Sequence, residues 1–138
     1  MSEIQLNSNS VSLGDWVDEL FKKIFFQPDD ALSKEVFTEY IAPDLLVRYN
    51  HSRFTYDQFL DAITQGRMKD SMSIQSNDEI QAWDAPDGSG AGCVAHMSLF
   101  TLTDKQTNQA VKSSSLILAN VQVRDGKRVL AELTEIAK

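Results

Sequence analysis

The fold of this chain is decided in the stretch Ile41-Ala42-Pro43-Asp44-Leu45-Leu46-Val47-Arg48-Tyr49-Asn50-His51. Pro43 disfavours helical geometry in the residue before it, so a preceding helix must end near Ile41. The residues from Leu45 to Asn50 favour a strand. Alternation along that strand places Tyr49 and His51 on the same face. The stretch is therefore the junction between a helical first third and a sheet.

Two helices are expected before the junction and one after it. Apolar residues at helical spacing predict a helix over residues 12–26, which ends before a proline. The pair Asp29-Asp30 supplies caps for a second helix. Thr55 and Gln58 have the spacing of a capping box, so a third helix should begin there and end near Arg67.

The remaining sequence lacks helical periodicity and indicates strands joined by turns. The turn signals are the stretch from Asp84 to Gly90, the polar residues 104–108 and the pair Asp125-Gly126. The order of elements predicts one α+β domain over residues 11–138, with three helices packed in the concave face of a strongly curved, mostly antiparallel sheet. Residues 1–10 are polar and are expected to be a disordered tail. The expected strands are Met72–Asp84, Cys93–Thr103, Val111–Arg124 and Arg128–Ile136.

Composition narrows the classes of partner. The chain has 20 acidic and 13 basic side chains, a net charge of −7, and no run of lysine or arginine. Nucleic acid and anionic membranes are held mainly by basic side chains, so neither is expected as a partner. A single cysteine, Cys93, indicates a reducing compartment, which predicts a cytoplasmic protein.

The sequence carries no motif for a cofactor. It has no glycine-rich phosphate loop and no nucleophile elbow, and its two histidines lie too far apart for a local metal motif. We therefore expect no cofactor and no metal. What remains is acid/base chemistry on a small apolar molecule, or binding alone.

The order and lengths of the elements resemble the nuclear transport factor 2-like (NTF2-like) superfamily, the cystatin-like α+β cone of SnoaL-like cyclases, ketosteroid isomerases, limonene epoxide hydrolases and scytalone dehydratases. The resemblance covers nearly the whole chain. It implies a small-molecule pocket inside the cone and a homodimer formed through the outer face of the sheet. Because this superfamily includes enzymes and non-enzymatic binders, the resemblance is specific for fold and not for function.

A narrower likeness to the scytalone dehydratases lies in the opening stretch. Ile41-Ala42-Pro43-x-Leu45-x-x-x-Tyr49 is similar to the segment whose tyrosine polarises the substrate carbonyl through water in that family. Counting back without a gap places Asp30 on an active-site aspartate of the family, and Ser115 falls on a pocket serine. The family's two catalytic histidines would fall near Ser76 or Asn77 and near Phe100, none of which is histidine. That reaction is therefore not carried over.

The residues themselves give four candidates for proton transfer and hydrogen bonding. Tyr49 and His51 share a strand face, and a neutral imidazole suits proton transfer near neutral pH. His96 points into the cone if the strand face on which it lies is turned toward the helices. It could equally be a core histidine with satisfied hydrogen bonds. Asp30 could exchange protons if burial raised its pKa, although a helix N-cap also explains it.

The candidate pocket wall comes from the same strands and from aromatic residues of the helices. Small hydroxyl side chains in mid-strand could leave room for a ligand, or could be polar edge positions. Large aromatic residues at these spacings more often belong to a core. The strand face opposite to that of His96, which runs from Cys93 to Leu99, is apolar enough for a dimer surface. The substrate-binding candidates are Trp16, Tyr40, Ser98, Phe100 and Ser115.

Two functions are compatible with these residues. The first is a cofactor-free isomerase, dehydratase or cyclase that transfers protons on an apolar carbonyl compound. Tyr49 would hydrogen-bond the substrate oxygen, and His96, His51 or Asp30 would shuttle the proton. The second is a non-enzymatic module for ligand binding or dimerisation that uses the same cone.

Overall fold

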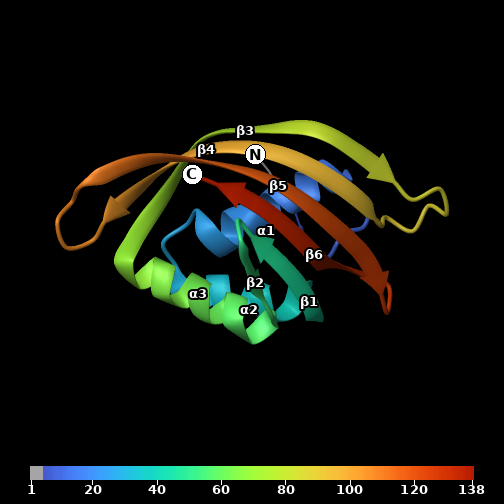
Figure 1. Ribbon diagram of the computed structural model, residues 1–138. Helices are drawn as coiled ribbons and strands as arrows, with labels where there is room; N and C mark the ends of the chain where they lie inside the picture. Colours follow the sequence, from blue (N-terminus) through green and yellow to red (C-terminus); the bar gives the residue numbers. More distant parts are fainter. Residues whose placement is uncertain (1–4) are drawn as a thin grey trace.

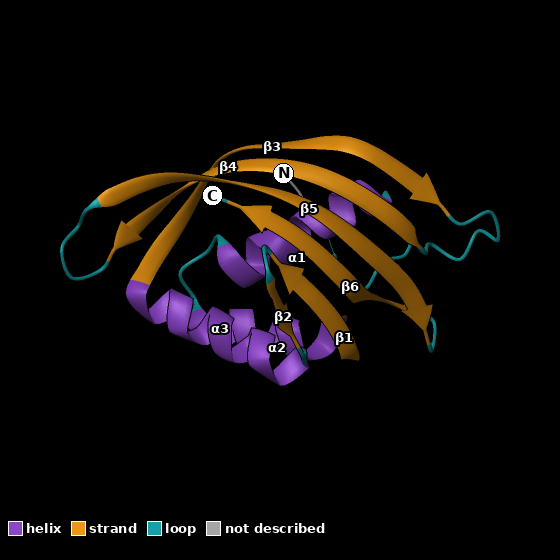
Figure 2. Cartoon of the chain, viewed as in Figure 1, coloured by secondary structure: helices purple, strands orange, loops and turns teal. Residues whose placement is uncertain are grey.

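The computed structural model describes residues 5–138 as three helices and a single mixed sheet that arches over them (Figure 1). Figure 2 shows the long strands β3 to β6 forming the arch, with α1 under it and with β1 and β2 near α2 and α3. The predicted α+β fold, with helices on the concave side of the sheet, is confirmed. The elements are α1 (Leu13–Phe25), α2 (Asp30–Tyr40), β1 (Ile41–Tyr49), β2 (Ser52–Phe54), α3 (Tyr56–Lys69), β3 (Asp70–Asp84), β4 (Gly92–Asp104), β5 (Ala110–Arg124) and β6 (Lys127–Ala137).

The helix ends follow the capping chemistry of the sequence. The Ser12 side chain accepts from the backbone N–H of Asp15 at the start of α1. Asp29, rather than Asp30, caps α2 by accepting from the N–H of Leu32. Thr55 caps α3 in a complete capping box. These caps satisfy N–H groups that have no partner within the helix, which is why local sequence locates the starts so well.

The sheet has the strand order β2-β1-β6-β5-β4-β3. Only β1 and β6 pair in parallel, and the other neighbours are antiparallel. The register of β3 against β4 shifts twice, between Ile74 and Ser76 and between Glu79 and Gln81. Such bulges bend a strand and increase its twist, which helps the sheet to arch over the helices.

The junction stretch differs from its prediction in two ways. The strand begins at Ile41, directly after α2, and not at Leu45. Its register with β6 breaks between Ile41 and Leu46, a segment containing Pro43, which has no N–H to donate to a neighbouring strand. The short strand β2, which the sequence did not suggest, then turns back through Asn50, a residue with a positive φ of 52°.

The core lies between α1 and the concave face of the sheet. Trp16, Val17 and Leu20 of α1 are completely buried, in the same core cluster as Leu130 and Leu133 of β6. In the described part of the N-terminal segment, Leu6 is also buried, and its carbonyl accepts from Nε1 of Trp16 at 2.8 Å. Residues 1–4, part of the predicted tail, lie outside the described residues. No helix within residues 5–138 is long and apolar enough to cross a membrane.

Candidate acid/base site

Register places one row of side chains across five strands of the concave face. Its members are Glu79, His96, Ile117, Glu135 and Tyr49, from β3, β4, β5, β6 and β1 in turn. Neighbouring strands lie about 4.8 Å apart, so the Cα atoms of His96 and Glu135 are separated by about 10 Å. Four of the five side chains in this row can exchange protons. Of these, His96 is buried, Glu135 is partly buried, and Glu79 and Tyr49 are exposed.

His96 is almost fully buried and is held by the aspartate of α1. Its side chain is 1% exposed, and Nδ1 lies 2.5 Å from Oδ1 of Asp18. A carboxylate only accepts hydrogen bonds, so Nδ1 carries the hydrogen and donates it. The Asp18 side chain is 38% exposed and thus forms the outer member of a histidine–aspartate pair.

Two further side chains, Asn77 and Ser98, extend this pair through hydrogen bonds. Asn77 of β3 donates from Nδ2 to the same Asp18 oxygen at 2.5 Å. Ser98 of β4 donates to Oδ1 of Asn77 at 2.8 Å. The result is a continuous hydrogen-bonded chain from Ser98 through Asn77 and Asp18 to His96.

The second nitrogen of His96 is in a different situation. Nε2 is buried and has no hydrogen-bond partner among the described residues. Oε1 of Glu79 lies 3.9 Å from it, beyond hydrogen-bonding distance. With the hydrogen on Nδ1, a neutral His96 keeps the lone pair of Nε2 free to accept a proton.

Glu135 supplies a second polar centre in the same row. Ser115 donates from its hydroxyl to Oε2 of Glu135 at 2.8 Å. Burial raises the pKa of Glu135, against a smaller opposing effect of the Ser115 hydrogen bond. Burial also raises the pKa of Tyr49, with a further contribution from the charge of Glu135. Both effects favour the protonated, hydrogen-donating forms of these side chains.

A small cavity of about 50 Å³ lies beside Glu135, whereas Asp18, His96 and Tyr49 are not part of its lining. Ser98, Ser115 and Glu135 are the polar residues of its lining. A second hollow of about 180 Å³, near Arg67 and Lys105, shares some of its lining with the first. The residues common to both are Phe25, Phe26 and Met72.

Three of the predicted substrate-binding residues, Ser98, Phe100 and Ser115, line the cavity. Trp16 and Tyr40 do not line it, and they pack edge to face in the core with ring centroids 6.2 Å apart. These two residues remain predictions as contacts of a substrate.

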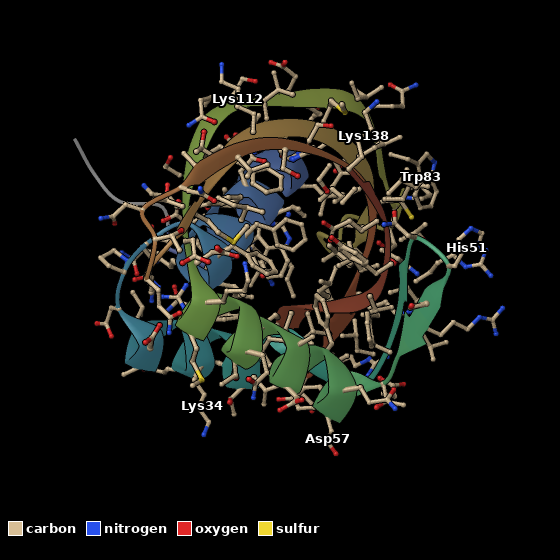
Figure 3. All side chains as sticks on the ribbon, turned by 60° about the vertical axis from the view of Figure 1, so that its left-hand side comes forward. Lys34, His51, Asp57, Trp83, Lys112 and Lys138 are labelled. Carbon is tan, nitrogen blue, oxygen red and sulfur yellow. The ribbon has the colours of Figure 1, made fainter. Side chains whose placement is uncertain are left out.

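The four predicted catalytic residues are not brought to one point. His96 is the buried member of the pair with Asp18, and Tyr49 lies next to Glu135 with 36% of its surface exposed. Asp30 is exposed at the start of α2 and pairs with Nε of Arg67 at 2.8 Å. Figure 3 shows His51 on the outside of the molecule, beyond the end of β1.

Asp18 and Glu135 were not identified from the sequence, although each leaves a signal there. Gly14, Asp18, Phe21 and Phe25 follow helical spacing, so Asp18 interrupts an otherwise apolar or small stripe beside the main one. Glu135 lies on the same face of the last strand as the buried Leu133. A charged residue on a buried parity is a usable indicator of an internal site.

The described residues contain no group of three or more His, Cys, Asp or Glu side chains arranged to hold a metal ion. The side chains that meet in this site can donate, accept and transfer protons.

No protein-family model matches the chain, and no curated protein matches it in sequence. Its fold does match solved structures. A conserved protein from Planctomyces limnophilus superposes with a TM-score of 0.70 at 12% identity, over 86% of this chain and 87% of that one. A SnoaL-like protein from Jannaschia sp. CCS1 gives a TM-score of 0.65 at 11% identity, over 100% and 91%.

A hexachlorocyclohexane dehydrochlorinase, LinA type 2, gives a TM-score of 0.64 at 10% identity, over 86% of this chain and 80% of that one. Structures of this group are NTF2-like, SnoaL-like and ketosteroid isomerase-like proteins. The chain therefore has the NTF2-like fold, as its sequence pattern suggested. At such low identity the likeness concerns the fold alone.

Proposed function

We propose that this protein is a cofactor-free enzyme that transfers a proton on a small apolar carbonyl compound, in an isomerisation, dehydration or cyclisation. The observation that carries the proposal is the buried His96, which is oriented by Asp18 while its other nitrogen has no partner among residues 5–138. A histidine kept only for packing would be expected to have both nitrogens satisfied, because an unpaired buried polar group costs stability.

In this proposal Asp18 and His96 act as one proton-accepting unit. Asp18 is the more exposed partner, so its carboxylate receives the substrate proton, and the N–H at Nδ1 of His96 holds that carboxylate in place by donating to it. The Ser98–Asn77 connection fixes the orientation of the carboxylate from the cavity side. These contacts give Asp18 the fixed geometry that a general base requires.

Glu135 and Tyr49 are the proposed donors to the substrate oxygen. Burial favours the neutral form of Glu135, and a neutral carboxyl can donate a hydrogen bond to a carbonyl as negative charge develops on it. Tyr49 lies next to Glu135 in register and has a hydroxyl that burial keeps protonated. The aromatic walls of the cavity favour an apolar substrate.

The cavity volume limits how a substrate can enter. Sites for small molecules usually enclose roughly 300–1,000 Å³, several times the 50 Å³ enclosed here. Phe26 and Met72 separate the cavity from the second hollow, and both are partly exposed. We propose that the substrate enters by displacing these two side chains.

An exchange assay tests the proposal without knowledge of the natural substrate. A panel of small cyclic ketones is incubated with the protein in deuterium oxide, and loss of the α-proton signal is followed by NMR. Wild-type protein should accelerate exchange for at least one ketone, and Asp18→Asn should abolish the acceleration. Equal rates with wild-type protein and with Asp18→Asn would contradict the proposal.

The small cavity and the exposed positions of Asp30 and His51 favour a second candidate, a ligand-binding module without catalysis. This candidate predicts that a ketone broadens or shifts protein resonances while its own α-protons exchange at the rate of the buffer. The same NMR samples therefore distinguish the two functions.

We further propose that two copies associate through the outer face of the sheet, in a reducing compartment such as the cytoplasm. This face carries exposed apolar side chains, among them Trp83 at 59% and Leu118 at 54% exposure, around a shallow depression. Trp83 projects from the outside of the molecule in Figure 3. Cys93, a free and exposed thiol on the same face, is consistent with a reducing compartment.

A further inference from the structure

The unpartnered nitrogen of His96 is directed at one charged side chain. Nε2 is buried, and Oε1 of Glu79 lies 3.9 Å away. Glu79 is the register partner of His96 on the neighbouring strand β3. Its side chain is 49% exposed, so one carboxylate is close to both the buried nitrogen and the solvent.

Gly14 of α1 makes this approach possible. A Cβ atom at position 14 would overlap Oε1 of Glu79 and would lie 3.7 Å from Nε2 of His96. Gly14 belongs to the first turn of α1, where unsatisfied N–H groups and the helix dipole favour a negative charge. The absence of a side chain there lets the Glu79 carboxylate rest against the helix, above Nε2.

His96 therefore lies between two carboxylates, one at each nitrogen. Asp18 contacts Nδ1, and Glu79 faces Nε2 across a gap about 1 Å longer than an ordinary hydrogen bond. A rotation of the Glu79 side chain closes such a gap, because half of that side chain is free in solvent. Asp18 and Glu79 are then connected through the imidazole ring.

We propose that Glu79 is a proton-relay residue that connects the buried Nε2 of His96 to bulk water, so that protons can pass through His96 to and from Asp18. A proton from water binds to Glu79 and passes to Nε2, and the proton on Nδ1 passes to Asp18. In the reverse direction Asp18 returns a proton to Nδ1, Nε2 releases its proton to Glu79, and Glu79 releases it to water. Each transfer moves one proton and leaves the bonds between heavy atoms unchanged.

The use of this relay in catalysis rests on the proposed function, but the relay itself operates without substrate. A proton that Glu79 delivers to Nε2 releases the Nδ1 hydrogen to the partly exposed Asp18, where it exchanges with water. The relay therefore predicts that exchange of the Nδ1 hydrogen depends on Glu79. The chain has only two histidines, so nitrogen-15 labelling of histidine gives signals from His96 and from the exposed His51 alone. His51 then serves as an internal reference for exchange in open solvent.

The test compares exchange rates of the His96 Nδ1 hydrogen, measured by transfer of saturation from water. Glu79→Gln keeps the shape of the side chain and removes its proton affinity, and should slow exchange about tenfold or more. Gly14→Ala displaces the carboxylate and should slow exchange in the same direction. Asp78→Asn removes an equal charge from the adjacent residue, which points to the other face of β3, and should leave the rate unchanged.

Unchanged exchange in Glu79→Gln would overturn the relay. Faster exchange in that variant would also overturn it, because Glu79 would then be a cover that keeps water from Nε2. Neither result depends on ketone turnover, so failure of the relay and failure of the proposed enzymatic function are detected separately.

Discussion

Replacement of His96 by leucine distinguishes a histidine kept for chemistry from one kept for packing. In the folded protein His96 makes one charge-assisted hydrogen bond, from Nδ1 to Asp18, and buries Nε2 without a partner among residues 5–138. Such a bond contributes about 1.5–3 kcal/mol, and an unpaired buried polar group costs about 1–3 kcal/mol. These effects oppose each other, so His96→Leu should change the free energy of unfolding by about 1.5 kcal/mol or less.

Two control variants calibrate this expectation. Ile117→Ala removes a buried apolar side chain from the same row and should cost about 2–5 kcal/mol. Asp18→Ala leaves the Nδ1 hydrogen of His96 without an acceptor and should cost about 1–3 kcal/mol in the wild-type background. Most of that cost should disappear in the His96→Leu background, because the orphaned donor is gone.

Urea unfolding at neutral pH, followed by far-ultraviolet circular dichroism, measures all four variants on one scale. A loss above about 3 kcal/mol for His96→Leu would refute the reasoning, because it would match removal of a core residue. Additive effects of Asp18→Ala and His96→Leu would also refute it, since they would show that the two side chains contribute independently.

Three further predictions address the acid, the route into the cavity and the outer face. Burial raises the pKa of Glu135 in the folded state, so its ionisation costs stability as pH rises from the ordinary value of 4.5 through the folded-state pKa. Glu135→Gln should therefore have a higher free energy of unfolding than wild type in urea titrations at neutral pH, and no advantage below pH 4.5. The same difference between variant and wild type at both pH values would contradict this. Phe26→Ala should join the two hollows and strengthen binding of an apolar fluorescent probe. A probe titration identical to that of wild type would contradict this. Light scattering should give twice the 15.5 kDa chain mass for wild type and one chain mass for Trp83→Glu, whereas a monomeric wild type would contradict the proposed dimer.

Sequence reasoning located the elements well where the controlling interactions are local. Helix α1 begins and ends within one residue of its prediction, because caps and periodicity lie within the segment itself. The prediction missed the start of β1 at Ile41, because the first residues of this strand are held in place by contacts with α2 and β6 that are not local in sequence. The three-residue strand β2 is too short to show alternation.

The sequence predicted which face of the strand carries the candidate site, but it did not predict which side chain pairs with His96. Alternation placed His96, Ser98 and Phe100 on one face of β4, and the structure shows that this face is the inner one. The partner of His96 comes from α1, and only the packing of that helix under the sheet brings Asp18 to it. The gap-free comparison counted back from Tyr49 selected Asp30 of α2 as the acidic residue of the site, and not Asp18 of α1.

The central claim is that the pair of Asp18 and His96 transfers the substrate proton. The most direct measurement compares ketone α-proton exchange by His96→Gln and His51→Gln, since these are the only two histidines of the chain. His51→Gln should match wild type, and His96→Gln should lose about 10²–10⁴-fold in rate, the usual contribution of a positioned acid or base. Equal activity of the two variants would contradict the account.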